Sequence, residues 1–155
     1  RAQQDNINDN NGEIGLYSRL IETDSATFPR NEKVYSLGGM SDSFYEYTLK
    51  LWILSNYNDK LAIKMYVESI TAANEKLLRM IYDKNRREEA YFFYGELWYT
   101  KFRGKMEELQ CFMPGVLALG SYHAILRSKD AEKNPDTRPL TEYERLLIDE
   151  TDKHL

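Results

Sequence analysis

Apolar residues recur at helical spacing in two stretches near the middle of the chain. The first stretch begins near Ser41, and its apolar members are Phe44, Tyr47, Leu51 and Leu54, widened by Tyr45, Leu49 and Trp52. A face this broad indicates a helix that packs against neighbours on more than one side. Polar residues 56–59 interrupt the pattern, and a second stripe predicts a helix from about Asp59 to Tyr82; its members are Ile63, Tyr66, Val67, Ile70, Ala73, Leu77 and Ile81. Together the two stretches predict a helical hairpin over residues 41–82.

The second half of the chain predicts a small β element followed by helices. Residues 90–102 are dense in aromatic side chains and favour a strand, and residues 107–112 suit a second short strand, which gives a β element over residues 90–112. Pro114 fits the first turn of a helix over residues 115–127. A polar loop is expected over residues 128–139, and capping residues at 141–144 open a last helix that runs to Leu155. Residues 114–155 are therefore predicted as helices with one polar loop.

The first 40 residues form a different kind of segment. Residues 1–11 are rich in Gln, Asn and Asp and are expected to be a flexible lead-in, and residues 12–39 are expected to be irregular or short extended structure. The chain begins with Arg1 rather than Met, so we expect an internal, processed or truncated start. The pattern as a whole predicts a mainly α chain with a small β-hairpin element.

Composition narrows the function classes. The net charge of −4 over 155 residues gives no sign of a nucleic-acid or anionic-membrane binder. No apolar run approaches about 18 residues, so we expect no membrane span. Cys111 is the single cysteine, which excludes a disulfide or a cysteine-based metal site within this chain, and a lone cysteine is usually a small buried side chain. The 12 tyrosines suit either a carbohydrate cleft or plain helix packing.

The segment Gly38-Gly39-Met40-Ser41-Asp42 carries the strongest candidate for chemistry. A carboxylate at a helix N-terminus meets oriented N–H groups, which favour its ionised form. Asp42 is thus either a plain N-cap or a carboxylate directed into a cleft. Glu46 follows one helical turn later, where it could join Asp42 in binding sugar hydroxyls or simply pair with Lys50.

The run from Tyr35 to Tyr47, with Asp42-Ser43-Phe44-Tyr45-Glu46-Tyr47 at its end, resembles a signature segment of the class I α-1,2-mannosidases, glycoside hydrolase family 47. The resemblance implies that Asp42 is one of three acidic residues at the catalytic centre. It also implies that the position of Met40 influences which mannose branch is preferred. This position is Arg in the endoplasmic-reticulum type and leucine-like in the Golgi type, so Met40 leans towards the latter.

A second block, Lys105 to Gly120, is similar to another segment of the same family. The resemblance assigns four residues to substrate binding: Met40, Glu46, Glu107 and Glu108. Glu108 stands where many members have a His that contacts the sugar. Cys111 matches a cysteine that pairs in the family with one further along, and no second cysteine follows here. Gly95-Glu96-Leu97 and His123 also match, more weakly, and His123 is interpreted as packing or surface.

The resemblance implies an inverting enzyme that removes terminal α-1,2-linked mannose from high-mannose N-glycans in the secretory pathway. It implies an (α/α)7 barrel and a Ca²⁺ ion whose protein ligand lies outside this chain. The chain is expected to be a partial catalytic domain, inactive alone, that works with the remaining segments of the barrel. Two other hypotheses stay open: a non-catalytic glycan-binding or scaffold relative with the same helices, and a helical interaction module.

Overall fold

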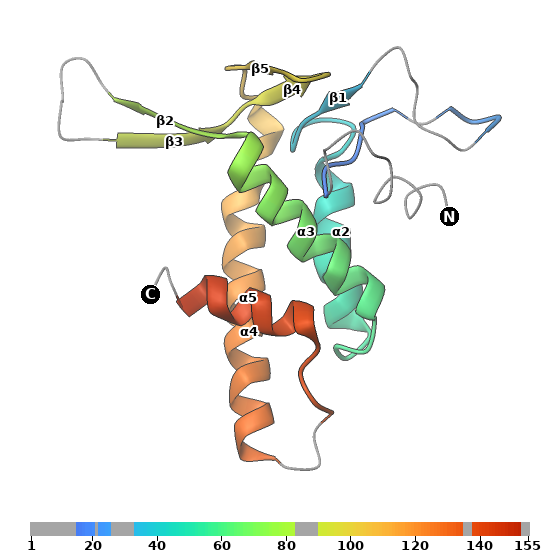
Figure 1. The fold of residues 1–155 in the computed structure, drawn as a ribbon, viewed down its shortest axis with the longest axis vertical. Coiled ribbons are helices and arrows are strands. Elements are labelled where there is room, and N and C mark those ends of the chain that lie inside the picture. The colour runs from blue at the N-terminus through green and yellow to red at the C-terminus, as the bar shows by residue number, and fades with distance from the viewer. Residues whose placement is uncertain (1–14, 21, 26–32, 83–89, 135–137, 153–155) are drawn as a thin grey trace. The chain divides into compact units, whose positions relative to one another are not determined.

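The computed structural model describes residues 15–20, 22–25, 33–82, 90–134 and 138–152, which are mainly helical with two small antiparallel sheets (Figure 1). This confirms the prediction of a mainly α chain with a small β element. Contacts divide the chain into two compact units, one of residues 1–45 and 68–111 and the other of residues 46–67 and 112–155. The expected flexible lead-in, residues 1–11, lies outside the described residues.

Helix α2 (Asp42–Leu54) begins and ends close to where the apolar pattern placed it. Its buried apolar residues are Tyr45, Leu49 and Trp52, each at most 1% exposed. The other apolar stripe is exposed: Tyr47 at 55%, Leu51 at 49% and Leu54 at 78%. Burial on more than one side is therefore not seen within the described structure, and one face of α2 remains open to solvent.

Helix α3 (Lys60–Lys76) is shorter than predicted, because residues 78–82 form a strand instead of its last turns. Strand β2 (Leu78–Tyr82) pairs antiparallel with β3 (Ala90–Tyr94) (Figure 1). Leu78 lies opposite Tyr94 in this pair. Leu78, Arg79 and Met80 favour helix by intrinsic propensity, so cross-strand contacts with an aromatic partner strand outweigh that preference. The expectation that the helix reaches Tyr82 was wrong, and Ile81 is 53% exposed rather than part of a buried stripe.

A second sheet has the strand order β1-β4-β5. It joins β1 (Val34–Tyr35) to β4 (Glu96–Trp98) and β4 to β5 (Lys101–Arg103), so the strand predicted over residues 90–102 is present but divided into three. Gly95 separates β3 from β4, and a Cβ there would lie 2.5 Å from both the Arg103 carbonyl oxygen and the Phe102 ring. Only glycine allows this close approach.

The strand predicted over residues 107–112 was wrong, because residues 108–112 form a 3-10 helix, η1 (Glu108–Phe112). The Gln110 N–H donates to the Glu107 carbonyl, 3.1 Å away, which closes a turn. The side chains of these two residues bond to the loop before α2, so the segment curls toward that loop instead of pairing with a strand.

The other unit contains α4 (Met113–Lys133), with Pro114 in its first turn as predicted. The helix continues through residues 128–133, which were expected to be loop, and Arg127 pairs there with Asp130 one turn later (3.3 Å). Gly120 is required by packing, because a Cβ there would lie 2.3 Å from the Tyr66 hydroxyl oxygen. Tyr66 is itself buried and donates to the Val116 carbonyl.

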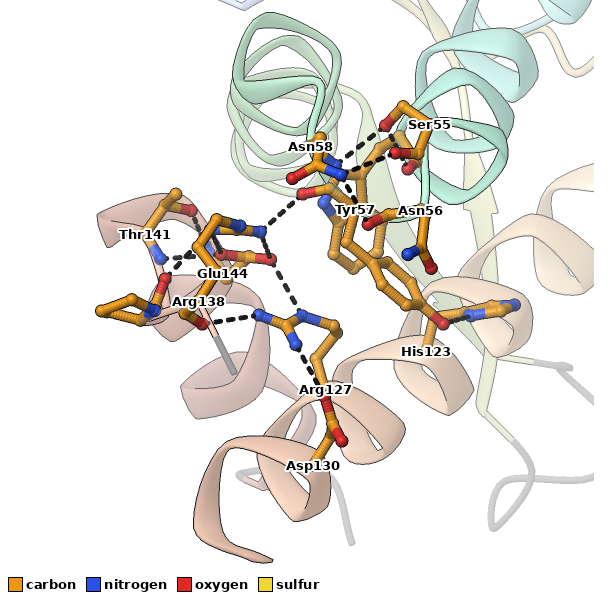
Figure 2. Close-up of polar contacts among 12 residues, drawn as sticks. Ser55, Asn56, Tyr57, Asn58, His123, Arg127, Asp130, Arg138, Thr141 and Glu144 are labelled. Carbon is orange, nitrogen blue, oxygen red and sulfur yellow. Dashed lines mark hydrogen bonds and ion pairs between the residues drawn. The ribbon is translucent and has the colours of Figure 1, made fainter. Parts of the chain in front are cut away.

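Helix α5 (Glu142–Asp152) lies across α4 (Figure 1). It begins with the predicted capping box. The Thr141 N–H donates to Glu144 (2.7 Å), and the Glu144 N–H donates to the Thr141 hydroxyl (3.2 Å). Glu144 is only 1% exposed. Its carboxylate also forms ion pairs with Arg127 (3.2 Å) and Arg138 (2.8 Å), as Figure 2 shows. Arg138 further donates to the Tyr57 carbonyl in the turn after α2.

Nearby, the Tyr57 hydroxyl lies 2.9 Å from Nδ1 of His123, which is half-buried (Figure 2). Burial lowers the pKa of His123. This position supports the interpretation of His123 as a packing residue.

Residues 108–133, which include α4, are long and apolar enough to cross a membrane on length and composition alone, and no other described helix is. The expectation of no membrane span rested on the absence of a long apolar run. The finding is weak evidence against it, since an apolar helix in a protein core can meet the same two conditions.

Candidate functional site

Asp42 is the first residue of α2, and its side chain is partly exposed. Its own N–H donates to the Gly38 carbonyl (2.8 Å), which fixes the start of the helix. Among the described residues, none donates a hydrogen bond or forms an ion pair to the Asp42 carboxylate. Asp42 is therefore not acting as a side-chain N-cap, and its carboxylate is available at the positive end of the helix.

The loop before Asp42 is held by hydrogen bonds at both ends. The Ser41 hydroxyl donates to the Ser36 carbonyl (2.7 Å), and the Gly38 N–H donates to the Ser36 hydroxyl (2.9 Å). The Gln110 side-chain amide donates to the same hydroxyl (3.2 Å). Between these bonds, Met40 has a φ of 75°, a left-handed conformation unusual for Met, and its side chain is 68% exposed.

Glu107 contacts this loop directly. Its Oε2 accepts a hydrogen bond from the Gly39 N–H (2.8 Å), and its Oε1 pairs with Lys105 (3.0 Å). The hydrogen bond from Lys105, aided by the one from Gly39, lowers the pKa of Glu107 despite partial burial. A Cβ on Gly38 would lie 2.6 Å from Oε2, so the carboxylate packs closely against the loop.

Glu96 is a buried acidic residue behind this contact that the sequence analysis did not single out as functional. Its side chain is 0% exposed, with one oxygen accepting from the Trp98 indole N–H (2.9 Å) and the other 3.4 Å from Lys105. The only sequence signal was its place in the Gly95-Glu96-Leu97 match. A charged residue inside an aromatic strand is unusual, and this could have marked it.

Tyr45 anchors the first turn of α2. Its hydroxyl accepts from the Tyr17 N–H (3.2 Å) and donates to the Tyr17 carbonyl (3.4 Å). Complete burial raises the pKa of Tyr45, so its hydroxyl keeps the proton that it donates. The helix turn that carries Asp42 is thus fixed by its own buried side.

The remaining candidates are more scattered. Glu108 is exposed and has no partner among the described residues. Glu46 belongs to the other unit, where it pairs with Lys50 (2.5 Å), the simpler of the two expected roles. It also lines an open pocket of about 180 Å³ with Lys50 and residues of α4. Cys111 is exposed, so the expectation of a buried cysteine was wrong.

The described residues do not fit a metal site. No group of three or more His, Cys, Asp or Glu side chains comes together in the part of the chain that the structure describes. Calcium needs several oxygen ligands, and Asp42 supplies one free carboxylate. We therefore assign no metal ligand among the described residues.

Comparison with known proteins explains why both sequence blocks resemble segments of one family. The family model of glycosyl hydrolase family 47 matches residues 2–141. The human "endoplasmic reticulum mannosyl-oligosaccharide 1,2-alpha-mannosidase" is 39% identical over 111 residues, 72% of this chain and 15% of the relative. The pig "mannosyl-oligosaccharide 1,2-alpha-mannosidase IA" is 36% identical over 112 residues, 69% of this chain and 15% of the relative.

The human "mannosyl-oligosaccharide 1,2-alpha-mannosidase IB" is 41% identical over 86 residues, 56% of this chain and 12% of the relative. The matched region is therefore a small share of each relative. The family match over residues 2–141 includes the glycine pair, Asp42 and the segment around Glu107. The chain belongs to glycosyl hydrolase family 47.

Proposed function

We propose that this chain forms part of the catalytic centre of a mannosyl-oligosaccharide 1,2-α-mannosidase that removes terminal α-1,2-linked mannose from high-mannose N-glycans with inversion. The observation that carries the proposal is the Asp42 carboxylate. It is held at a helix N-terminus on a tightly bonded loop, yet it receives no hydrogen bond from the described residues. A carboxylate that served only the fold would be paired or capping.

Inversion needs one carboxyl group to protonate the leaving oxygen and another to activate water. Asp42 supplies one acidic group, and by family membership the others come from segments outside this chain. Met40, which lies two residues before Asp42 and has an exposed side chain, is proposed to contact the sugar and influence branch preference. Glu46, Glu107 and Glu108 are proposed to lie at the substrate, with Glu108 replacing a family His.

The rest of the protein is proposed to complete an (α/α)7 barrel in the secretory pathway. The chain spans only 15% of the human relative named for the endoplasmic reticulum. In support, the face of α2 formed by Tyr47, Leu51 and Leu54 is exposed, as expected of a helix whose neighbours lie in other segments. The chain is proposed to be inactive alone, and an active monomer of this chain by itself would contradict that.

A non-catalytic glycan-binding relative is the second candidate, and Glu108 favours it. A carboxylate at this exposed position cannot act as the imidazole that many members use to contact the sugar. It could still accept hydrogen bonds from sugar hydroxyls.

Asp42→Asn in the full-length protein separates the two candidates. With a high-mannose oligosaccharide as substrate, we expect turnover to fall about 100-fold or more, because a placed charge is removed from the reaction centre. The melting temperature should stay near that of the wild type, since the Asp42 carboxylate has no hydrogen bond or ion pair with the described residues. Unchanged turnover, or a wild type that binds the oligosaccharide without cleaving it, would favour the non-catalytic candidate.

A further inference from the structure

The loop that leads to Asp42 contains a strained residue. Met40 has a φ of 75°, a left-handed conformation that is unfavourable for a residue with a Cβ. Such conformations persist where the surroundings hold them. Ser41 is fixed on one side of Met40 by its bond to the Ser36 carbonyl.

On the other side, Gly39 is fixed by Glu107. The Gly39 N–H donates to Glu107 Oε2 at 2.8 Å, across 68 positions of sequence. An ionised acceptor makes this bond shorter and stronger than a neutral one. The strained residue therefore lies between two bonds, one local and one that reaches a distant segment.

Glu107 is in turn held by a chain of contacts that begins in the sheet. Lys105 lies 3.0 Å from Glu107 and 3.4 Å from Glu96, and so bridges the two carboxylates. Glu96 is completely buried, and its second oxygen is taken by the Trp98 indole N–H. A buried carboxylate is stabilised only when a cation or hydrogen-bond donors contact it. Glu96 is therefore a fixed partner that holds the Lys105 ammonium in place.

We propose that Glu107, Lys105 and Glu96 are positioning residues that hold the turn at Met40 and thereby set the direction of the Asp42 carboxylate. The expected effect on catalysis rests on the proposed function. Its structural part, the hold on Gly39, stands independently of any activity. Glu107 then serves the reaction through the loop in addition to any contact with the sugar.

The main test is Glu107→Ala in the full-length protein, assayed with a high-mannose oligosaccharide and corrected for the folded fraction. Misdirection of Asp42 predicts a loss of about 10- to 100-fold in kcat. Loss of a sugar contact by Glu107 would raise KM in addition, so the fall in kcat is the readout that tests the positioning role. A raised KM with kcat unchanged would overturn the proposal and leave Glu107 as a sugar contact; unchanged values for both would also overturn it.

Lys105 allows a graded version of the same test. Lys105→Met should lower kcat, as Glu107→Ala does. Lys105→Arg should retain most of the wild-type kcat, because a guanidinium still pairs with both carboxylates. The matched control is Lys129→Met, which removes an exposed lysine of α4 with no partner among the described residues and should change nothing. Equal losses in Lys105→Met and Lys129→Met would overturn the proposal.

Gly38→Ala tests the contact from the loop side. Its Cβ would lie 2.6 Å from Glu107 Oε2 and should displace the carboxylate, whereas a Cβ on Gly115 meets nothing within 4 Å and gives a control. Because both changes disrupt one contact, Gly38→Ala combined with Glu107→Ala should lower kcat no further than Glu107→Ala alone. Fully additive losses would overturn the shared contact.

Hydrogen exchange at the Gly39 amide separates this inference from the proposed function. The bond to Glu107 predicts a protected Gly39 amide in the wild type and faster exchange in Glu107→Ala and Lys105→Met, with no change in Lys129→Met. If the wild type has no mannosidase activity but Gly39 exchange responds in this way, the proposed function fails and the positioning contact stands. If Gly39 exchange is the same in all variants, the positioning contact fails whatever the activity.

Discussion

Two glutamates, one in each unit, accept the same kinds of hydrogen bond and ion pair, but one is partly exposed and the other is buried. Glu107 accepts from a backbone N–H at 2.8 Å and from Lys105. Glu144 accepts from a backbone N–H at 2.7 Å and from Arg127 and Arg138. The side chain of Glu107 is 25% exposed, whereas that of Glu144 is 1% exposed.

The groups around the two glutamates account for the difference. Around Glu144, the cations and the carboxylate satisfy one another, and Arg138 also reaches the Tyr57 carbonyl (Figure 2). Around Glu107, the bonds hold a loop in which the Met40 side chain is exposed and which leads to Asp42, whose carboxylate has no partner among the described residues. A cluster that is complete within itself maintains the fold, and one that holds unpaired groups in place prepares a site.

Glu144→Gln should have the largest effect on stability. The change leaves two guanidinium groups facing a neutral amide in a buried position, and breaking a buried pair in this way costs about 3 kcal/mol or more. The measurement is the free energy of unfolding of the full-length protein in urea.

Glu107→Gln is the matched comparison, because it removes the same charge from a partly exposed carboxylate. We expect a much smaller change in the free energy of unfolding, since water can replace the lost contacts. Equal destabilisation by the two changes would break the comparison and make the Glu107 cluster a structural one.

The sequence allowed the local parts of both clusters to be predicted. Thr141 and Glu144 are three positions apart, so their capping box follows from spacing alone. The contact of Arg138 with the Tyr57 carbonyl spans 81 positions, and that of Gly39 with Glu107 spans 68. No local pattern encodes such pairs, so the sequence marked Asp42 and Glu107 separately but not the bond through Gly39 that connects Glu107 to the loop before Asp42.

The same limit explains the errors in secondary structure. Periodicity identified α2 but gave its exposed stripe the same weight as its buried one, because the two stripes are equally apolar. Residues 78–82 continued a helical stripe in sequence, yet the partner strand at 90–94 determines their structure. Both errors come from contacts that lie outside any short window of sequence.

Thr141→Ala should have an intermediate effect. The change removes the hydroxyl that accepts the Glu144 N–H, at 3.2 Å, while the buried ion pairs remain. Loss of an N-cap costs about 1 kcal/mol in the free energy of unfolding. Thr141→Ser keeps the hydroxyl and is the control, and a loss in Thr141→Ser equal to that in Thr141→Ala would assign the effect to packing of the methyl group.

The smallest expected effect is on how the free energy of unfolding depends on acid pH. It compares the two glutamates through the loss of their negative charge. Burial by itself would raise the pKa of Glu144, but hydrogen bonds from Arg138 and Thr141 outweigh it and leave the pKa below its ordinary value of 4.5. The bond from Lys105 likewise holds the pKa of Glu107 below 4.5. A carboxylate with a lowered pKa stabilises the fold at any pH above the value in the unfolded chain, and this stabilisation is lost as pH falls through the folded value.

Unfolding free energies measured from pH 7 down through the acid range should therefore decline less steeply in each Glu→Gln variant than in the wild type, because the variant has one fewer group to protonate. We expect the flattening to be greater for Glu144→Gln, where solvent screens the interaction less. Acid limbs that are flattened equally, or more by Glu107→Gln, would show that the exposed cluster contributes as much to the fold as the buried one, and the distinction between a structural and a positioning carboxylate would fail.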